Sequence, residues 1–162
     1  YKQIFSPQTA YQMVSILEGV VKRGTGKGLR DLNLQIAGKT GTTNKNTDAW
    51  FIGFTSNLVI GVYVGHDNPQ SLGKYETGSK TAMPIFKEFV KNEVNNYKAR
   101  PFKVAEGIVM MVVDETTGKK ANFSSNKTII ESFKKEKIEN DLKIGIDDLD
   151  YKISKNNILK FY

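Results

Sequence analysis

Residues 34–65 decide the fold, and they read LQIAGKTGTTNKNTDAWFIGFTSNLVIGVYVG. Three extended runs lie in this stretch, over residues 34–43, 49–55 and 58–64, and short polar turns separate them. Such a pattern predicts three antiparallel strands joined in chain order. The last run is almost continuously apolar, so we expect it to be buried on both faces.

A helix is predicted on each side of this sheet. Ser6 and Pro7 form a helix start, and apolar residues recur at helical spacing as far as residue 22. The glycine-rich loop 24–28 ends that helix. A second apolar stripe predicts a helix over residues 81–95, with Pro84 in its first turn. The fold class is therefore α+β, an antiparallel sheet flanked by helices.

The sequence changes character beyond residue 97. Residues 1–97 form the main lobe, and residues 98–137 form a small C-terminal extension. That extension holds an apolar run over 107–113, a turn over 114–118 and a short helix over 128–137. Residues 138–162 alternate lysine, aspartate, asparagine and isoleucine without periodicity, which indicates a loosely ordered tail.

Composition excludes several classes of function. The 162 residues include no cysteine and one histidine, so disulfides, a thiolate nucleophile and a cysteine- or histidine-rich metal site are excluded. No metal or cofactor is therefore expected, and the His66-Asp67 pair has no second histidine to complete a site. The net charge of +7 favours anionic partners. Nucleic acid is one such class, but the chain carries no recognisable reading motif, so no nucleic-acid partner is expected.

The chemistry centres on Gly38-Lys39-Thr40-Gly41. A phosphate-binding loop requires a glycine where Asn33 stands and a helix directly after the motif, and neither requirement is met. The other candidate is the Lys-Thr-Gly triplet of active-site serine acyltransferases, in which a cation and hydroxyls on one strand hold a substrate carboxylate.

The surrounding residues support the second interpretation. Residues 37–43, 48–53 and 61–67 resemble the transpeptidase domain of class A penicillin-binding proteins, as do residues 10–13, 17–21, 24–26, 76–78 and 82–90. The resemblance covers residues 4–95 and continues weakly to about residue 133. It implies part of the penicillin-binding, β-lactamase-like fold and a serine D,D-transpeptidase that cross-links peptidoglycan. It also implies β-lactam binding, and a place on the extracytoplasmic side of the bacterial inner membrane with an anchor absent from this chain.

The resemblance also implies a role for each residue of the motif. Lys39 supplies positive charge beside the nucleophile and the substrate carboxylate, and Thr40 and Thr42 offer hydroxyls to that carboxylate. The Thr42 backbone N–H is one oxyanion donor. Gly41 leaves room for the ligand, and Thr43 completes the substrate-binding set. Trp50, Gly53 and Asp67 match the family but are assigned to structure and positioning, with Trp50 packed under the sheet.

Two of the family's three motifs are not in place. The order in the family is S-x-x-K, then S-x-N, then K-T-G, whereas Ser71-x-x-Lys74, Ser132-x-x-Lys135 and Ser124-Ser125-Asn126 all follow Lys39. We therefore interpret these three as chance matches and the chain as the C-terminal portion of a longer enzyme, inactive on its own. A non-catalytic binding or dimerisation module is the alternative. The sheet face and edge that the rest of the polypeptide would cover should make the isolated chain associate.

Overall fold

The computed structural model describes residues 2–97 and 100–138. It divides the chain into two units, Tyr1–Glu106 and Gly107–Tyr162, which are described separately below. No helix within the described residues is long and apolar enough to span a membrane.

Helix α1, Pro7–Lys22, has the bounds that the sequence predicts. The Ser6 hydroxyl accepts a hydrogen bond from the backbone N–H of Thr9 at 3.2 Å, and Pro7 occupies the first turn, where its missing N–H costs nothing. After the turn at residues 24–26 the chain forms a short 3₁₀ helix, η1, over Lys27–Leu32. Its buried Leu29 anchors this connection to the core.

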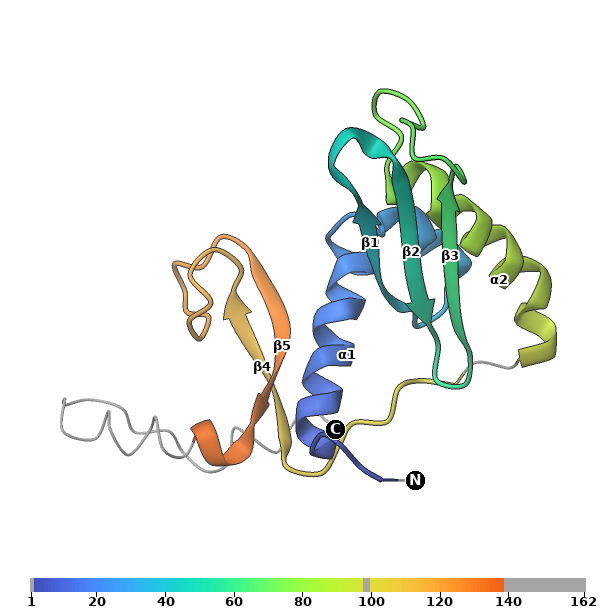
Figure 1. Cartoon of the computed structure of the whole chain (residues 1–162). Coiled ribbons are helices and arrows are strands. Elements are labelled where there is room, and N and C mark those ends of the chain that lie inside the picture. Colours follow the sequence, from blue (N-terminus) through green and yellow to red (C-terminus); the bar gives the residue numbers. More distant parts are fainter. Residues whose placement is uncertain (1, 98–99, 139–162) are drawn as a thin grey trace. The chain divides into compact units, whose positions relative to one another are not determined.

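Three strands form the antiparallel sheet of the first unit: β1 (Ala37–Thr42), β2 (Asp48–Phe54) and β3 (Val59–Gly65). Their order is β1-β2-β3, so the predicted topology is confirmed (Figure 1). The turn between β1 and β2 contains the one-turn helix η2, Asn44–Asn46. The prediction that the third run is buried on both faces is wrong. In β3 alternate side chains face solvent, and Val59 is 72% exposed.

Helix α2, Met83–Tyr97, covers the inner face of the sheet and continues from a single π-helical turn, η3, over Gly78–Ala82 (Figure 1). The Phe51 and Phe86 rings meet edge to face, with centroids 4.8 Å apart, and both are fully buried. The remaining core comes from α1, η1, the residue before β1, β2 and the η3–α2 segment: Val21, Leu29, Ile36, Ala49, Ala82, Met83 and Val90. Because both helices contribute, the predicted fold class is confirmed.

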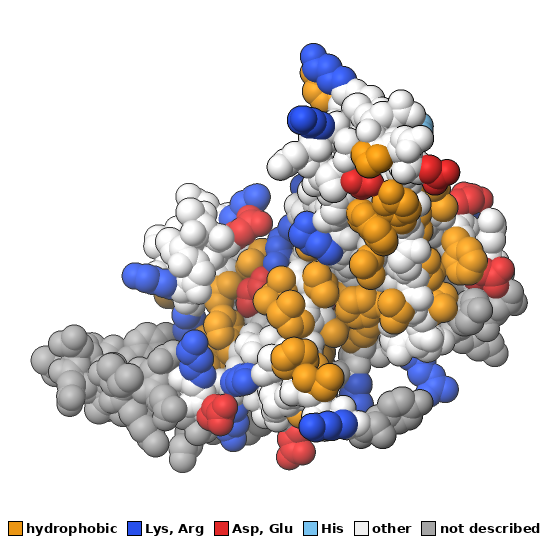
Figure 2. Space-filling model, in the orientation of Figure 1, with side chains coloured by type: hydrophobic (Ala, Val, Ile, Leu, Met, Phe, Trp, Pro, Cys, Tyr) orange, Lys and Arg blue, Asp and Glu red, His pale blue; other side chains and the backbone are white. Residues whose placement is uncertain are grey.

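The opposite side of the sheet carries an outer apolar face, made of Trp50, Ile52, Val59 and Tyr63. Trp50 is 42% exposed and lies against the Tyr63 ring, with centroids 4.7 Å apart. The prediction that Trp50 packs under the sheet is therefore wrong, because strand alternation assigns the buried side to its neighbour Phe51. Figure 2 shows apolar side chains gathered over this part of the molecule.

The first unit continues beyond residue 97. The Phe102 backbone N–H donates to the Gln35 side-chain carbonyl at 2.9 Å, and its ring packs against Phe54 with centroids 5.7 Å apart. Residues 100–102 therefore pack against the end of this sheet.

The second unit is a hairpin of β4 (Ile108–Asp114) and β5 (Thr128–Lys134). Its turn begins as predicted: the Gly118 N–H donates to the Asp114 carbonyl at 2.9 Å, and Gly118 has a φ of 68°. The helix predicted over 128–137 is wrong for residues 128–134, because β-branched Thr128, Ile129 and Ile130 favour an extended strand that pairs with β4. The tail predicted over 138–162 lies, from residue 139 on, outside the described residues.

Candidate functional site

The edge of β1 that faces away from β2 carries the motif. The Thr43 N–H donates to the Asp48 carbonyl at 3.1 Å, which makes these two residues a hydrogen-bonded pair. Because such pairs alternate along an antiparallel ladder, Thr42, opposite Ala49, belongs to a non-hydrogen-bonded pair. Its N–H and that of Thr40 therefore point away from β2. Within the described residues β1 has no strand along this edge, so backbone donors line it.

Lys39 adds positive charge to the same edge. Its side chain starts on the outer side of the sheet, beside Ile52 of β2, and its ammonium donates to the Thr40 carbonyl at 2.9 Å. That carbonyl points away from β2 for the same reason as the Thr40 N–H. The Lys39 side chain thus turns round the strand edge, and its charge lies where the backbone donors point. Lys39 itself is exposed to solvent.

The two threonine hydroxyls lie on the inner side and are already oriented. Thr40 Oγ1 is 2.9 Å from Thr25 Oγ1, in the loop after α1. Thr42 Oγ1 accepts a hydrogen bond from the Gly78 N–H at 3.0 Å. A hydroxyl that accepts an N–H still has its own proton to donate. We did not predict a role for Thr25 or Gly78. The available signal was the family resemblance of residues 24–26 and 76–78, which contain both.

Two glycines beside the motif leave room for close packing. A Cβ on Gly41 would lie 3.0 Å from the Trp50 Cβ, which is tighter than nearly all real Cβ contacts. A Cβ on Gly78 would lie 2.5 Å from the Gly41 carbonyl oxygen and would also clash with the carbonyl of Trp50. The turn η3 therefore rests directly on the backbone of β1 and β2, and this contact fixes the height of the Gly78 N–H above Thr42.

A hydrogen-bonded network, here called the turn network, closes the β1–β2 turn. The Thr43 hydroxyl accepts the Asp48 N–H at 2.8 Å and lies 2.7 Å from the Thr47 hydroxyl. One Asp48 carboxylate oxygen accepts the Tyr63 hydroxyl at 2.8 Å, and the other accepts the Thr47 hydroxyl at 2.9 Å. The Thr43 hydroxyl therefore forms hydrogen bonds within the turn. This does not favour the substrate contact that we expected for Thr43.

The turn network changes the titration of two of its members. The Tyr63 and Thr47 hydroxyls hold the pKa of Asp48 below its ordinary value, because both bonds stabilise the carboxylate. The same bond raises the pKa of Tyr63, because the phenol must keep its proton to donate. Desolvation and the negative charges of Asp48 and Asp67 raise the pKa of Tyr63 further. Around neutral pH the network therefore contains a carboxylate and a neutral phenol.

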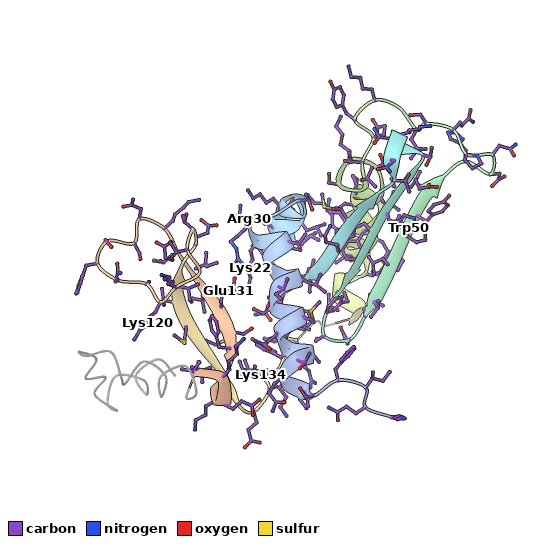
Figure 3. All side chains as sticks on the ribbon, turned by 60° about the vertical axis from the view of Figure 1, so that its left-hand side comes forward. Lys22, Arg30, Trp50, Lys120, Glu131 and Lys134 are labelled. Carbon is purple, nitrogen blue, oxygen red and sulfur yellow. The ribbon has the colours of Figure 1, made fainter. Side chains whose placement is uncertain are left out.

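Positive charge continues into the elements that precede β1. Figure 3 labels Lys22 at the end of α1 and Arg30 in η1. Lys22 forms an ion pair with Glu18 one turn earlier, at 3.2 Å, so its charge is partly compensated. The strand edge with Lys39 can hold an anion. A carboxylate fits this edge because its two oxygens can accept hydrogen bonds from the ammonium and from a hydroxyl.

Neither of the two S-x-x-K pairs has the arrangement that the resemblance requires. Ser71 lies in the loop between β3 and η3, and its hydroxyl accepts the Gly73 N–H at 3.2 Å. The ammonium of Lys74 lies over the Tyr75 ring, 5.2 Å from its centroid. Ser132 is buried within β5, in the second unit. Neither serine begins a helix, which is the arrangement that the resemblance requires of a nucleophile.

Comparison with known proteins agrees with the arrangement of the first unit. Residues 1–91 match the family model of the penicillin-binding protein transpeptidase domain. Penicillin-binding protein 1A of Rickettsia prowazekii is 46% identical over 142 residues, which cover 86% of this chain and 18% of that protein. The corresponding protein of Pseudomonas aeruginosa is 38% identical over 136 residues, covering 83% of this chain and 16% of its own length.

A solved structure is similar as well. The crystal structure of penicillin-binding protein 1A from Haemophilus influenzae superposes with a TM-score of 0.69 at 30% identity, over 79% of this chain and 20% of that one. The chain therefore spans about a fifth of the length of the relatives that it matches.

Proposed function

Because the chain belongs to the penicillin-binding protein transpeptidase family, we propose that it supplies the Lys-Thr-Gly side of a peptidoglycan D,D-transpeptidase active site. The substrate of this site is a stem peptide that ends in D-Ala-D-Ala. The nucleophilic serine and its base come from a preceding segment of the same polypeptide. The observation that carries the proposal is the edge of β1, which combines the Lys39 ammonium with the outward N–H of Thr42.

In the reaction, the serine hydroxyl oxygen attacks the carbonyl carbon of the penultimate D-Ala and gives its proton to the neighbouring base. The peptide bond breaks, the terminal D-Ala leaves with a proton, and a serine ester remains. An amine from a second stem peptide then attacks the ester, forms the cross-link and returns the proton to the serine. β-Lactams acylate the same serine, because their ring amide supplies a carbonyl for attack and a nearby carboxylate takes the place of the peptide terminus.

Each residue of the edge has a part in this scheme. Lys39 holds the terminal carboxylate electrostatically and lowers the energy of the charge that develops near the serine. The Thr42 N–H donates to the carbonyl oxygen as it becomes an oxyanion. The Thr42 proton remains available for the carboxylate, because its oxygen only accepts from Gly78. The hydrogen bond with Thr25 orients the Thr40 hydroxyl. Gly41 has no side chain, which leaves room on the strand for the backbone of the substrate peptide.

The proposal places the reaction on the extracytoplasmic side of the bacterial inner membrane, where peptidoglycan lies. The net charge of +7 is compatible with an anionic wall or membrane surface. The second candidate is a binding or dimerisation module, and the observation that favours it is the outer apolar face, which a second copy could cover.

Mass spectrometry after treatment with penicillin tests the proposal. The 162-residue chain should gain no adduct, because among the described residues of the first unit no serine lies at this edge with the required base. The same chain preceded by its S-x-x-K and S-x-N segments should gain one adduct. In that longer protein Lys39→Ala should slow acylation by about 10²–10³-fold, the usual cost of one electrostatic donor. Thr42→Pro deletes the N–H and should cost about as much. An adduct on Ser71 or Ser132 would contradict the assignment of the nucleophile.

A further inference from the structure

We propose that Asp48 is a positioning residue, held by Tyr63 and Thr47, that fixes the direction of the Thr42 backbone N–H. This inference rests on the proposed function, because the direction of that N–H matters only if the N–H is an oxyanion donor. Asp48 forms two hydrogen bonds with Thr43, the residue that follows Thr42, so it acts on Thr42 through Thr43.

The covalent position of Thr42 explains why its direction needs support. Thr42 is the last residue of β1, and a strand end frays unless something holds the next residue. A few degrees of rotation at the end of a strand move an N–H away from the point where an oxyanion forms. Oxyanion donors work only when they are held in place before the charge develops.

In the turn network, three groups of Asp48 supply that support. Its carbonyl accepts the Thr43 N–H, its N–H donates to the Thr43 hydroxyl, and its carboxylate accepts the Tyr63 and Thr47 hydroxyls. Thr43, the residue that follows Thr42, is thus held by hydrogen bonds to both its backbone N–H and its side-chain hydroxyl. Tyr63 reaches Asp48 of β2 diagonally from the neighbouring strand β3, because Asp48 lies opposite Gly65 and Tyr63 lies opposite Trp50. The support is thus tied to the strand of the sheet that lies farthest from β1.

Tyr63 is itself held by packing on the outer apolar face. Its ring lies 4.7 Å from the Trp50 ring, and a Cβ on the neighbouring Gly65 would clash with the Tyr63 hydroxyl. Gly65 is therefore the residue that lets the phenol reach across to Asp48. If the ring served only for packing, its hydroxyl would not need to point at the turn. Tyr63→Phe separates the packing of the ring from the hydrogen bond to Asp48, because it keeps the ring and removes only the hydroxyl.

The first test uses amide NMR of the 162-residue chain. Tyr63→Phe and Asp48→Ala should shift the Thr42 and Thr43 amide resonances and speed hydrogen exchange at Thr43 by about 10-fold or more. The matched control is Tyr75→Phe, which removes the hydroxyl of an exposed tyrosine outside the turn network and should leave both resonances in place. Unchanged Thr42 and Thr43 resonances in Tyr63→Phe would overturn the inference.

The second test uses the longer, penicillin-reactive protein. Tyr63→Phe should lower the acylation rate constant by about 10-fold and leave the dissociation constant of the non-covalent β-lactam complex within about twofold, because misplacement affects the transition state most. Asp48→Ala should have the larger effect, and Asp48→Asn should recover most of the rate, because its side-chain oxygen can still accept the Tyr63 hydroxyl.

Two outcomes separate the failure of this inference from the failure of the proposed function. If Lys39→Ala abolishes acylation while Tyr63→Phe and Asp48→Ala react at the normal rate, the transpeptidase site stands and the role of Asp48 is refuted. If the longer protein is not acylated at all, or if Lys39→Ala reacts normally, the proposed function fails, and the inference fails with it.

Discussion

Gly78→Ala is the most direct test of how η3 supports the site. The added methyl would lie 2.5 Å from the carbonyl oxygen of Gly41 and would clash with that of Trp50. Both obstacles are backbone atoms of the central ladder, which cannot rotate aside as a side chain can. The turn η3 must therefore lift from the sheet, and the bond from the Gly78 N–H to the Thr42 hydroxyl must lengthen or break.

The size of the effect follows from these contacts. Overpacking a well-packed site costs about 1–3 kcal/mol, and a clash with two backbone carbonyls belongs near the upper end of that range. The lost hydrogen bond adds about 1 kcal/mol. The free energy of unfolding of the first unit should therefore fall by about 4 kcal/mol.

Urea denaturation followed by tryptophan fluorescence measures this change. Trp50 is the one tryptophan in the sequence and lies in β2, so its signal reports the first unit alone. Gly61→Ala is the matched control. Its Cβ would meet only the Ile52 side chain, at 3.9 Å, so stability should change by less than about 0.5 kcal/mol. If Gly78→Ala were as stable as Gly61→Ala, our account of η3 resting on the strand backbone would be refuted.

Two further predictions concern the turn network and the outer apolar face. The pKa of Asp48 is lower in the folded chain, so its contribution to stability is present above the unfolded value of about 4 and is lost as the pH falls through the folded pKa. The pKa of Tyr63 is higher in the folded chain, so its contribution is present below the unfolded value of about 10 and is lost as the pH rises through the folded pKa. Urea denaturation of wild type and Tyr63→Phe should therefore differ most at neutral pH, and a difference that grew below about pH 4 would contradict this sign. Sedimentation of the isolated chain should show association that increases with concentration, since the outer apolar face and the β3 edge are exposed. Val59→Lys should weaken that association and Ile85→Lys, on α2, should not, whereas a monomeric wild type at about 100 µM would refute the prediction.

The local signals in the sequence were sufficient for most elements. Ser6-Pro7 and the apolar spacing after it located α1, because capping and helical periodicity act over a few residues. The short polar turns between the three extended runs located the strand ends to within a few residues. The helix predicted over 128–137 failed because its β-branched residues 128–130 pair with residues of β4 that lie 14 to 18 positions earlier in the chain.

The sequence by itself determined the motif, its family and the order of the strands, because each depends on residues that are close in the chain. Only the tertiary structure decided which face of each strand is buried. The alternation in β2 and β3 could have pointed Trp50 or Phe51 to the core, and the packing of α2 selected Phe51. Only the tertiary structure joined Asp48 to Tyr63 and Gly78 to Thr42, residues 15 and 36 positions apart, because strand register and the close approach of η3 create those contacts.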